Sequence, residues 1–549
     1  MSVVNIATHL TEMAARVPHQ AAIHCATGGN PGDVGSYRSM TFAELDDDSS
    51  VIASGLAEVG IGRGTRVALM VKPGIDLFAL TFALFKAGAV PVMIDPGIGL
   101  KNLKACLARA APTAFIGISA AHAARTLLGW GSATVEQTVT VGRRWFWGGL
   151  TIDEVRDAGR RNRRPPAETR RDEVAAILFT SGSTGVPKGA VYRHGNFEAQ
   201  VSEIRRMFGI RPGEVDVPTF PLFALFDPAL GMTSVIPHMD ATRPARVHPP
   251  NVIEAVNAFG ATTMFGSPAL LNTVGRWGEA HGSRMPTMRR IMAAGAPLPA
   301  PVMRRMLAML PPDAEVFPPY GATEALPVAV MSSREILGET WARTEAGAGV
   351  CVGRPVESIE LRVIEITDTP IRSWQDAREV ARGTVGEIVV RGPQVTLEYF
   401  EDHENTERSK ITGDDGTVWH RMGDIGYLDD AGRLWFCGRK SHRVETGAGR
   451  FASVNVEEIF NTHPDVFRTA LVGVGPFGSQ RAVLCVELEP KRRRDKGEII
   501  AELREMKARN PEAGCVEQFL LHPGFPVDIR HNAKIRREDL ARWAQEKTR

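Results

Sequence analysis

The sequence predicts an α/β protein: a large N-terminal domain of two helix-covered sheets with a small β-barrel-like subdomain, followed by a small α+β domain. Three observations support this prediction. Short β-branched apolar runs alternate with longer helical runs from about residue 40, the apolar period shifts towards two between about residues 349 and 437, and a mixed region follows. We therefore divide the chain into a large domain, 1–438, with sub-blocks of about 1–170, 171–348 and 349–438, and a small domain, 439–549.

The first sub-block has the pattern of repeated strand–helix–strand units. The runs RVALMV and AVPVMID are typical of buried strands, and they alternate with helices through DLFALTFALFKAG and from about Lys101. Strands connected in this way form a parallel sheet whose faces are covered by the helices.

The second block runs from about Ala175 to Leu310, with strands expected at AAILFT, ATTMFG and RIMAAG. Residues 159–171, between the blocks, are basic and contain two prolines, which favours a solvated linker over a binding patch. Further on, IELRVIE, GEIVVRG and RLWFCG alternate with a period near two. This alternation predicts a small antiparallel barrel or sheet.

The composition is that of a globular protein with large cores, since 43% of the 549 residues are hydrophobic and 23% are charged. A formal net charge of +2 predicts no general attraction to nucleic acid or anionic lipid. The six cysteines lack zinc or disulfide spacing, and the N-terminus lacks the features of a signal peptide. Because no apolar run is long enough to span a bilayer, we expect a cytoplasmic protein whose membrane contact is at most peripheral.

The densest motif is a loop of small residues after the expected strand AAILFT. Its glycine and hydroxyl residues present N–H groups and hydroxyls to a polyanion, and Lys188 adds a positive charge. The loop is not a Walker A motif, because Pro187 and Gly189 stand where that motif has glycine and a hydroxyl residue. The residues expected to hold phosphate are Thr180, Ser181, Gly182, Ser183, Thr184, Gly185 and Lys188.

The segment TSGSTGVPKG resembles the signature loop of the adenylate-forming enzymes, a superfamily of acyl-CoA synthetases, peptide-synthetase adenylation domains and beetle luciferases. FPPYGATEAL is similar to a second motif of that superfamily. This resemblance implies that Tyr320 and Gly321 lie at the adenine, Thr323 at the phosphates and Glu324 at Mg²⁺. The roles suit the residue types, since aromatic rings stack on purines and carboxylates are hard ligands for hard cations.

Two more segments resemble nucleotide-binding elements of the same superfamily. AAGAPL is similar to the turn beside the adenine, which implies that Gly295, Ala296 and Pro297 approach the base. WHRMGDIGYLDDAGRLWFCGR resembles the ribose-binding segment. The resemblance implies that Asp424 accepts hydrogen bonds from both ribose hydroxyls, with Arg439 beside it at the domain junction.

The C-terminal segment HNAKIRREDL lies where the superfamily carries its catalytic lysine, which implies that role for Lys534, although Asn-Ala replaces the usual Ser-Gly before it. The implied reaction is in-line attack of a carboxylate on the α-phosphate of ATP, giving acyl-AMP and pyrophosphate. Lys534, Glu324 and Thr184 would be the catalytic residues, with Mg²⁺ held by Glu324. The resemblance also implies a mobile C-terminal domain, with Ser441 in place of the usual Asp or Lys at the hinge.

The segments FPLFALFDPALGM and TMFGSPALL are expected to form the acyl pocket, and their bulky apolar residues favour a long or branched alkyl acid. We expect Phe223, Phe226, Phe265 and Gly266 to line it, with packing in the core as the alternative role for each aromatic. Asp227 is an acidic exception within the first segment.

Ala224 stands where many acyl-CoA synthetases have a histidine beside the thiol tunnel, which counts against the use of CoA. HNAK, FPLFALFDPALG and YGATEALPVAV resemble more closely the β-lactone synthetases of bacterial long-chain olefin biosynthesis. That resemblance implies a lipid-like 2-alkyl-3-hydroxyalkanoic acid as substrate, whose own hydroxyl closes a lactone with release of AMP. It also implies association with other hydrocarbon-pathway enzymes.

The alternative enzyme is a medium- or long-chain acyl-CoA synthetase or acyl-AMP ligase. From another class, the chain could be a catalytically silent nucleotide- or acyl-binding module, against which the intact Lys188, Glu324, Asp424 and Lys534 argue. His194 is a candidate base for the substrate hydroxyl, although a structural role is favoured. GRRWFWGG, residues 142–149, is either an interfacial patch or an ordinary buried hairpin, with the hairpin favoured.

Overall fold

The first sheet is parallel except at one edge, as the strand–helix–strand pattern predicts. The computed structural model describes residues 3–94, 98–179, 187–492, 494–527 and 534–548. The strands of this sheet are β3 Arg66–Met70, β4 Val90–Met93, β5 Ala114–Ile118, β6 Gln137–Val141, β7 Leu150–Thr151, β8 Val174–Phe179 and β9 Gly189–Arg193. They lie in the order β7-β6-β5-β3-β4-β8-β9, and β9 alone runs antiparallel to its neighbour. The helices that cover it are α2 Phe42–Glu58, α3 Ile75–Lys86, α4 Leu100–Ala110, α5 Ser119–Leu128, α6 Ile152–Arg161 and α7 His194–Phe208.

The second sheet has the same construction. Its strands are β1 Ala21–Ala26, β2 Tyr37–Thr41, β10 Val215–Pro218, β11 Thr233–Ile236, β12 Thr263–Gly266, β13 Arg290–Ala293 and β14 Glu315–Phe317, in the order β14-β13-β12-β10-β11-β1-β2. Its helices are α1 Thr8–Arg16, α8 Pro221–Ala224, α9 Asp227–Leu230, α10 Pro249–Ala258, α11 Pro268–His281 and α12 Ala300–Leu307. Two strands belong to the sheet on the other side of the sub-block boundary expected near residue 170. Strand β8, after that boundary, pairs with β4 in the first sheet, and β1, before it, pairs with β11 in the second.

The third sheet is antiparallel and open. The subdomain expected to resemble a β-barrel is therefore a sheet that does not close. Its strands are β15 Tyr320–Ala322, β16 Ala325–Val330, β17 Val350–Pro355, β18 Glu360–Ile364, β19 Gly386–Arg391, β20 Lys410–Thr412, β21 Val418–Leu428 and β22 Leu434–Arg439. They follow the order β15-β16-β17-β22-β21-β19-β18, with β20 paired to β21. Three short helices accompany it: α13 Ser333–Glu335, α14 Trp341–Glu345 and α15 His403–Ser409. The period-two segments found in the sequence are β18, β19 and β22.

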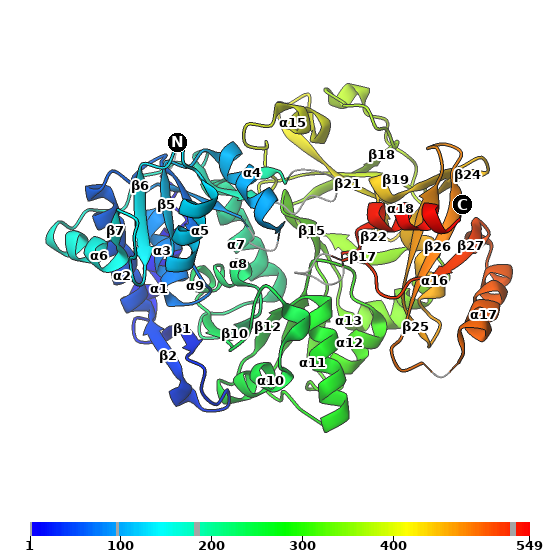
Figure 1. Cartoon of the computed structure of the whole chain (residues 1–549), viewed down its shortest axis with the longest axis horizontal. Helices are drawn as coiled ribbons and strands as arrows, with labels where there is room; N and C mark the ends of the chain where they lie inside the picture. The colour runs from blue at the N-terminus through cyan, green and yellow to red at the C-terminus, as the bar shows by residue number, and fades with distance from the viewer. Residues whose placement is uncertain (1–2, 95–97, 180–186, 493, 528–533, 549) are drawn as a thin grey trace.

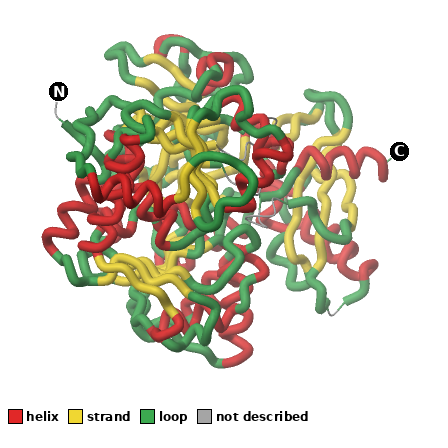
Figure 2. The backbone as a smooth tube through the Cα atoms, turned by 60° about the vertical axis from the view of Figure 1, so that its left-hand side comes forward, coloured by secondary structure: helices red, strands yellow, loops and turns green. Residues whose placement is uncertain are grey.

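The C-terminal part forms a separate small α+β group. It contains β23 Val444–Thr446, β24 Gly449–Phe451, β25 Val466–Val474, β26 Arg481–Leu488 and β27 Val516–Leu521, with α16 Ser453–Phe460, α17 Lys496–Arg509 and α18 Arg537–Lys547. This group lies at the right in Figure 1, at the far side of the molecule from the N-terminal strands. Figure 2 shows its strands with helices beside them, apart from the other sheets. The α/β architecture with a large N-terminal and a smaller C-terminal part is confirmed.

Local chemistry explains several of these elements. Helix α2 begins with a capping box, in which the Thr41 hydroxyl accepts from the Glu44 N–H and the Glu44 carboxylate accepts from the Thr41 N–H. Helix α3 is apolar on every side because it lies inside the core that the first two sheets share. Its buried end, Lys86, donates to the carboxylate of Asp46 at 2.6 Å, so this charge is paired.

The aromatic segment 142–149 is divided between core and surface. Trp147 is buried and stacked on His122, whereas Trp145 is 55% exposed and Phe146 is 65% exposed. The segment therefore forms neither a fully buried hairpin nor a continuous aromatic patch. None of the helices in the described part of the chain is long and apolar enough to cross a membrane.

Candidate active site

A cleft of about 1400 Å³ lies where the first two sheets, the third sheet and the C-terminal part meet. Most of the candidate residues predicted from the sequence line it: Lys188, Phe223, Phe226, Phe265, Gly295, Ala296, Pro297, Tyr320, Gly321, Thr323, Glu324, Asp424, Arg439 and Lys534. The loop residues Thr180, Ser181, Gly182, Ser183, Thr184 and Gly185 fall outside the described residues.

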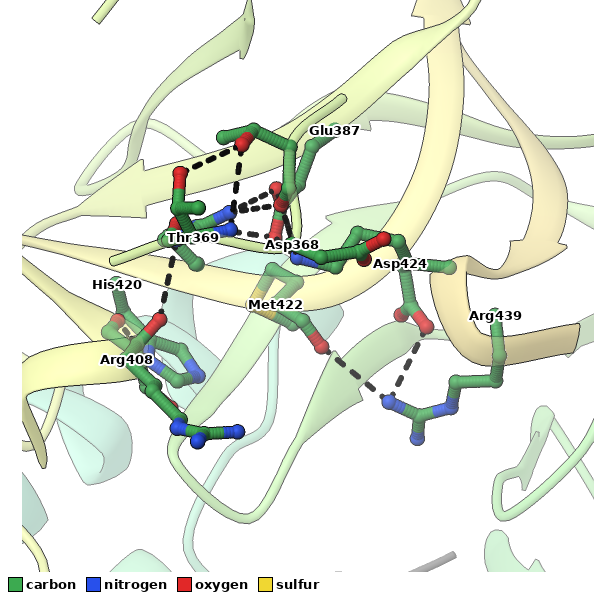
Figure 3. A network of polar contacts seen from close by, with 12 residues as sticks. Asp368, Thr369, Glu387, Arg408, His420, Met422, Asp424 and Arg439 are labelled. Atoms are coloured by element: carbon green, nitrogen blue, oxygen red, sulfur yellow. Dashed lines mark hydrogen bonds and ion pairs between the residues drawn. The ribbon is translucent and has the colours of Figure 1, made fainter. Parts of the chain in front are cut away.

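At one end of the cleft, three of these residues lie together. Asp424 on β21 lies opposite Arg439 on β22, and Arg439 Nη1 is 3.1 Å from Asp424 Oδ1. The Tyr320 hydroxyl donates to Asp424 Oδ2 at 2.6 Å. Arg439 also donates to the Met422 carbonyl, and Figure 3 shows both of its contacts.

The chemistry of this group suits a nucleoside. Asp424 Oδ1 is buried and, apart from its ion pair with Arg439, has no partner among the described residues, so it keeps a lone pair for a ribose hydroxyl. Burial raises the pKa of Asp424, and the charge of Arg439 opposes that shift. Burial, together with the neighbouring Asp424, raises the pKa of Tyr320, so its phenol remains a hydrogen-bond donor.

Two glycines allow the backbone to approach the same end. Gly295, in the turn after β13, has a φ of +102°, a conformation that L side chains rarely adopt. At Gly321 an added Cβ would lie 2.9 Å from the Ala325 carbonyl oxygen. Both positions therefore require glycine, and both border the space beside Tyr320.

A second polar group lies around Glu324. The Tyr399 hydroxyl donates to Glu324 Oε1 at 2.7 Å, and the Lys188 ammonium lies 5.2 Å from the centre of the Tyr399 ring. Burial lowers the pKa of Lys188, and the charge of Glu324 opposes that shift. Tyr192 fixes the adjacent backbone, because its hydroxyl donates to the Thr323 carbonyl. Thr323 and Glu324 are thus held by two buried tyrosines, Tyr192 from β9 and Tyr399 from the loop before α15.

Two buried bases lie behind this group, and the sequence did not single them out. Lys410 Nζ donates to the Thr396 carbonyl, and it lies 6.0 Å from the Tyr399 ring. Burial lowers the pKa of Lys410 to about 7. Burial also lowers the pKa of His420 well below its usual value, and the charge of Lys410 acts in the same direction. His420 is therefore a neutral imidazole in the wall of the cleft.

A buried ionic network in the wall of the cleft supports β21. Arg421 donates to both carboxylate oxygens of Glu387, at 3.1 Å and 2.6 Å, and Lys440 Nζ lies 3.0 Å from Glu387 Oε1. Arg421 also donates to the carbonyls of Thr369 and Arg408. Because Lys440 follows Arg439, this network fixes the chain at the start of the C-terminal part.

Lys534 brings the C-terminal part into the site. It lines the cleft, and its positive charge acts on the pKa values of Asp424 and His442, so it lies near the nucleoside end. The residue just before it, Ala533, falls outside the described residues. The arrangement places a cation from the small domain opposite the anionic groups of the large domain.

The described residues contain no group of three or more His, Cys, Asp or Glu side chains that could hold a metal ion. Glu324 instead offers a single carboxylate to the cleft. This suits Mg²⁺ bound together with a nucleotide, because protein-bound Mg²⁺ commonly takes one or two carboxylates and fills its shell with phosphate oxygens and water.

The apolar end of the cleft contains the expected aromatics. Phe223 stacks on Phe265 with ring centres 4.1 Å apart, and the ring centres of Phe226 and Phe197 are 6.3 Å apart. Gly266 was expected in this wall but does not line the cleft, because it ends β12 where a Cβ would contact Leu270 and Leu271 at 3.2 Å.

His194, considered above as a base, does not line the cleft either. It is 1% exposed, and its Nδ1 accepts a hydrogen bond from the Ile6 N–H at 3.2 Å. Burial lowers the pKa of His194 to about 4. It therefore has a structural role, which ties the N-terminal segment to α7.

Comparison with known proteins agrees with this geometry. Residues 10–400 match the model of the AMP-binding enzyme family. A protein of Xanthomonas campestris pv. campestris named olefin beta-lactone synthetase is 51% identical over 98% of this chain and 97% of its own length. A protein of Stenotrophomonas maltophilia with the same name is 51% identical over 98% of both chains.

Among solved structures, ATP-bound MatB from Rhodopseudomonas palustris superimposes with a TM-score of 0.79 and covers 100% of both chains at 20% identity. This likeness shows a shared fold. The family match includes the loop before β9, the Tyr320–Glu324 segment and the apolar end of the cleft. The chain therefore belongs to the AMP-binding enzyme family and is an adenylate-forming ligase.

Proposed function

We propose that this enzyme activates a long-chain 2-alkyl-3-hydroxy acid as its acyl-AMP and then closes a β-lactone through the 3-hydroxyl of the same molecule. The observation that carries the proposal is the 51% identity, over nearly the whole chain, to two proteins named olefin beta-lactone synthetase. The cleft supports it, because one continuous space joins the polar group around Asp424 and Glu324 to apolar walls.

In the first step, a carboxylate oxygen of the acid attacks the α-phosphorus of ATP. The bond between the α-phosphorus and the bridging oxygen breaks, and pyrophosphate leaves with the electron pair. We place Lys188 and Lys534 beside the phosphates, where their charges stabilise the equatorial oxygens, and Thr180–Gly185 around the leaving pyrophosphate. Tyr320, Asp424 and the Gly295 turn hold the adenosine, so catalysis consists of positioning and electrostatics.

Glu324 is the residue that we assign to Mg²⁺, together with the phosphate oxygens. When bound, the ion supplies positive charge at the phosphates during pyrophosphate release. Tyr399 orients the Glu324 carboxylate through its hydroxyl, and Lys410 adds a buried positive charge behind it at neutral and lower pH.

In the second step, the 3-hydroxyl oxygen attacks the carbonyl carbon of the acyl-AMP. The bond from that carbon to the phosphate oxygen breaks, AMP leaves, and the hydroxyl proton is released to water or to the departing phosphate. Both reacting groups belong to one molecule, so the cleft needs only to hold the acid in a bent conformation. His194 is excluded as the base, since its Nδ1 accepts a hydrogen bond from the Ile6 N–H and the residue lies outside the cleft.

The walls of the cleft fit a branched lipid-like acid better than a small one. Apolar residues line it from both parts of the large domain: Phe82, Phe85, Met93 and Leu178 come from elements of the first sheet, and Leu222, Leu225, Leu230, Met232 and Met292 come from elements of the second. Two alkyl chains on neighbouring carbons need a wide apolar space of this kind. At the position of the histidine found in many CoA-using relatives, Ala224 is fully buried and offers no polar group.

We also infer that the enzyme works in contact with the proteins that supply its acid and consume its lactone, because both molecules are poorly soluble in water. Exposed Trp145 and Phe146, beside Arg143 and Arg144, support peripheral contact with a membrane surface.

The test is mass spectrometry of the product formed from ATP, Mg²⁺ and a synthetic 2-alkyl-3-hydroxy acid, first without and then with CoA. A product lighter than the acid by one water, formed with AMP and without CoA, is the expected result. A thioester that appears only with CoA would replace the proposal by an acyl-CoA synthetase. Absence of AMP formation with any carboxylic acid would favour a silent binding module.

A further inference from the structure

Lys410 is a buried lysine whose hydrogen bonds have no part in the reaction proposed above. It lies on β20, opposite His420 on β21, and it is 8% exposed. Burial lowers the pKa of Lys410 to about 7, and the charges of Glu324 and Glu398 oppose that shift. An apolar side chain of the same length would fill this space without the cost of burying an amine. Filling the core therefore does not explain a lysine at this position.

The amine of Lys410 holds one residue of a neighbouring loop. Its Nζ donates to the Thr396 carbonyl, and at 3.4 Å it also donates weakly to the Thr396 hydroxyl oxygen. Thr396 is fully buried, in the loop that follows β19. Among the described residues, Lys410 is the only donor to this carbonyl. Removing the amine would therefore leave a buried backbone oxygen without a partner.

Thr396 in turn holds the backbone of Glu324. Its N–H donates to the Glu324 carbonyl at 2.9 Å, and its hydroxyl donates to the same oxygen at 3.2 Å. Three residues later in the same loop, the Tyr399 hydroxyl donates to the Glu324 carboxylate at 2.7 Å. The loop thus holds Glu324 at two points, its carbonyl and its carboxylate.

Lys410 supports the loop at both of these points. It bonds to Thr396, and its Nζ lies 6.0 Å from the centre of the Tyr399 ring. Lys410 is itself held in place, because β20 pairs with β21 in the third sheet. A functional side chain is placed accurately when the groups that hold it are fixed by a rigid element. Through Lys410 and this loop, the sheet therefore determines where Glu324 lies.

We propose that Lys410 is a positioning residue for the magnesium-binding carboxylate: it fixes the loop of Thr396 and Tyr399, and the loop fixes Glu324. This inference rests on the proposed function, because it takes Glu324 as the residue that binds Mg²⁺ with the nucleotide. Lys410 does not line the cleft, so it acts through the loop and not by contact with the substrate. Its loss should weaken the binding of Mg²⁺ and leave the binding of the acid unchanged.

Lys410→Met tests this role, because methionine has nearly the same length and lacks the amine. Binding of ATP is measured by calorimetry without acid over a range of Mg²⁺ concentrations, and pyrophosphate release is measured over the same range. The Mg²⁺ concentration for half-maximal effect should rise about tenfold in both measurements, as for other groups that orient a metal ligand. The KM for the acid should not change.

Lys86→Met is the matched control for the loss of a buried lysine. Lys86 pairs with Asp46 at 2.6 Å and does not line the cleft. Its loss should lower the melting temperature and leave both Mg²⁺ dependences as they are in the parent. If Lys410→Met behaves in the same way as this control, the proposal is overturned and Lys410 is a structural link between β20 and the loop.

Thr396→Val decides the question if the Lys410 variant does not fold. Valine keeps the shape of the side chain and removes the hydroxyl that links Lys410 to the Glu324 carbonyl. The half-maximal Mg²⁺ concentration should rise here too, by less than for Lys410→Met, because the backbone hydrogen bonds of Thr396 remain. A Thr396 variant with the parent's Mg²⁺ dependence would contradict the proposed path through the loop.

Glu324→Gln separates this inference from the assignment on which it rests. If that variant loses the effect of Mg²⁺ on ATP binding while Lys410→Met keeps it unchanged, the role of Lys410 is refuted and the assignment of Glu324 stands. If Glu324→Gln keeps the parent's Mg²⁺ dependence, the assignment is wrong and the inference fails with it. An enzyme that forms no lactone would refute the proposed second step, and the calorimetry without acid would still decide the role of Lys410.

Discussion

Replacing Tyr399 by phenylalanine removes one hydroxyl and nothing else from the site. That hydroxyl donates to Glu324 Oε1 at 2.7 Å, while the ring contacts Lys188 and Lys410. Tyr399 is 6% exposed, so phenylalanine fits the same space and keeps both cation–ring contacts. The variant therefore isolates the orientation of the carboxylate that we assign to Mg²⁺.

The size of the effect follows from the kind of hydrogen bond. A hydrogen bond to a charged group contributes about 1.5–3 kcal/mol, and 1.4 kcal/mol corresponds to a factor of ten. We expect kcat/KM for pyrophosphate release to fall roughly 10- to 100-fold. The Mg²⁺ concentration that gives half-maximal rate should rise, because a carboxylate that is free to rotate binds the ion less well.

The assay is pyrophosphate release as a function of Mg²⁺ concentration at saturating acid, together with a melting curve that verifies the fold. Tyr427→Phe is the matched control, because the Tyr427 hydroxyl donates to the Ala348 carbonyl at 3.1 Å and lies outside the cleft. An unchanged Mg²⁺ dependence in the Tyr399 variant would refute the role assigned to this hydrogen bond.

Three other predictions concern the small domain, the buried network and a titrating core residue. Lys534→Ala should slow pyrophosphate release by about 100-fold or more. The control variant Lys547→Ala, at the exposed end of α18, should keep the parent rate. Equal rates for the two variants would show that Lys534 takes no part in the reaction. Glu387→Gln leaves the buried Arg421 without its carboxylate and should lower the free energy of unfolding by about 3–5 kcal/mol, measured by denaturant melting; a change under about 1 kcal/mol would contradict the network. Burial lowers the pKa of His194 to about 4, so the unfolded chain alone binds this proton between about pH 6.5 and 4, and stability should fall as pH falls through that window. His194→Gln should show a shallower slope there, and an identical slope would assign the pH dependence to other groups.

Local patterns predicted the elements of the fold better than their pairing. The strands around AAILFT and RIMAAG lie where the apolar runs placed them, because period and turn residues are local properties. The sheet to which each strand belongs depends on partners far along the chain. Strand β8 pairs with β4, and β1 pairs with β11. No local pattern in the sequence indicates either pairing.

The same limit applies to the site. Tyr320, Asp424 and Arg439 could be predicted because short motifs carry them, and the structure brings them together. Tyr399 could not, because its role depends on contacts with Glu324, Lys188 and Lys410, which lie far away in the sequence.

The acyl wall gave a mixed result for a related reason. The aromatics Phe223, Phe226 and Phe265 line the cleft, whereas Gly266, one residue beyond Phe265, does not. Side chains on a strand alternate between faces, and α11 begins at once after β12 and covers this position.

Isotope transfer tests the central claim, that the carboxylate is activated and the 3-hydroxyl then attacks it. The acid is prepared with both carboxylate oxygens labelled with oxygen-18, and the label is followed by mass spectrometry in the lactone and in AMP. The account predicts one labelled oxygen in the lactone carbonyl and one in the phosphate of AMP, because the bond between the carbonyl carbon and the phosphate oxygen breaks. Two labelled oxygens in the lactone with none in AMP would mean that the hydroxyl is activated instead, and would contradict it.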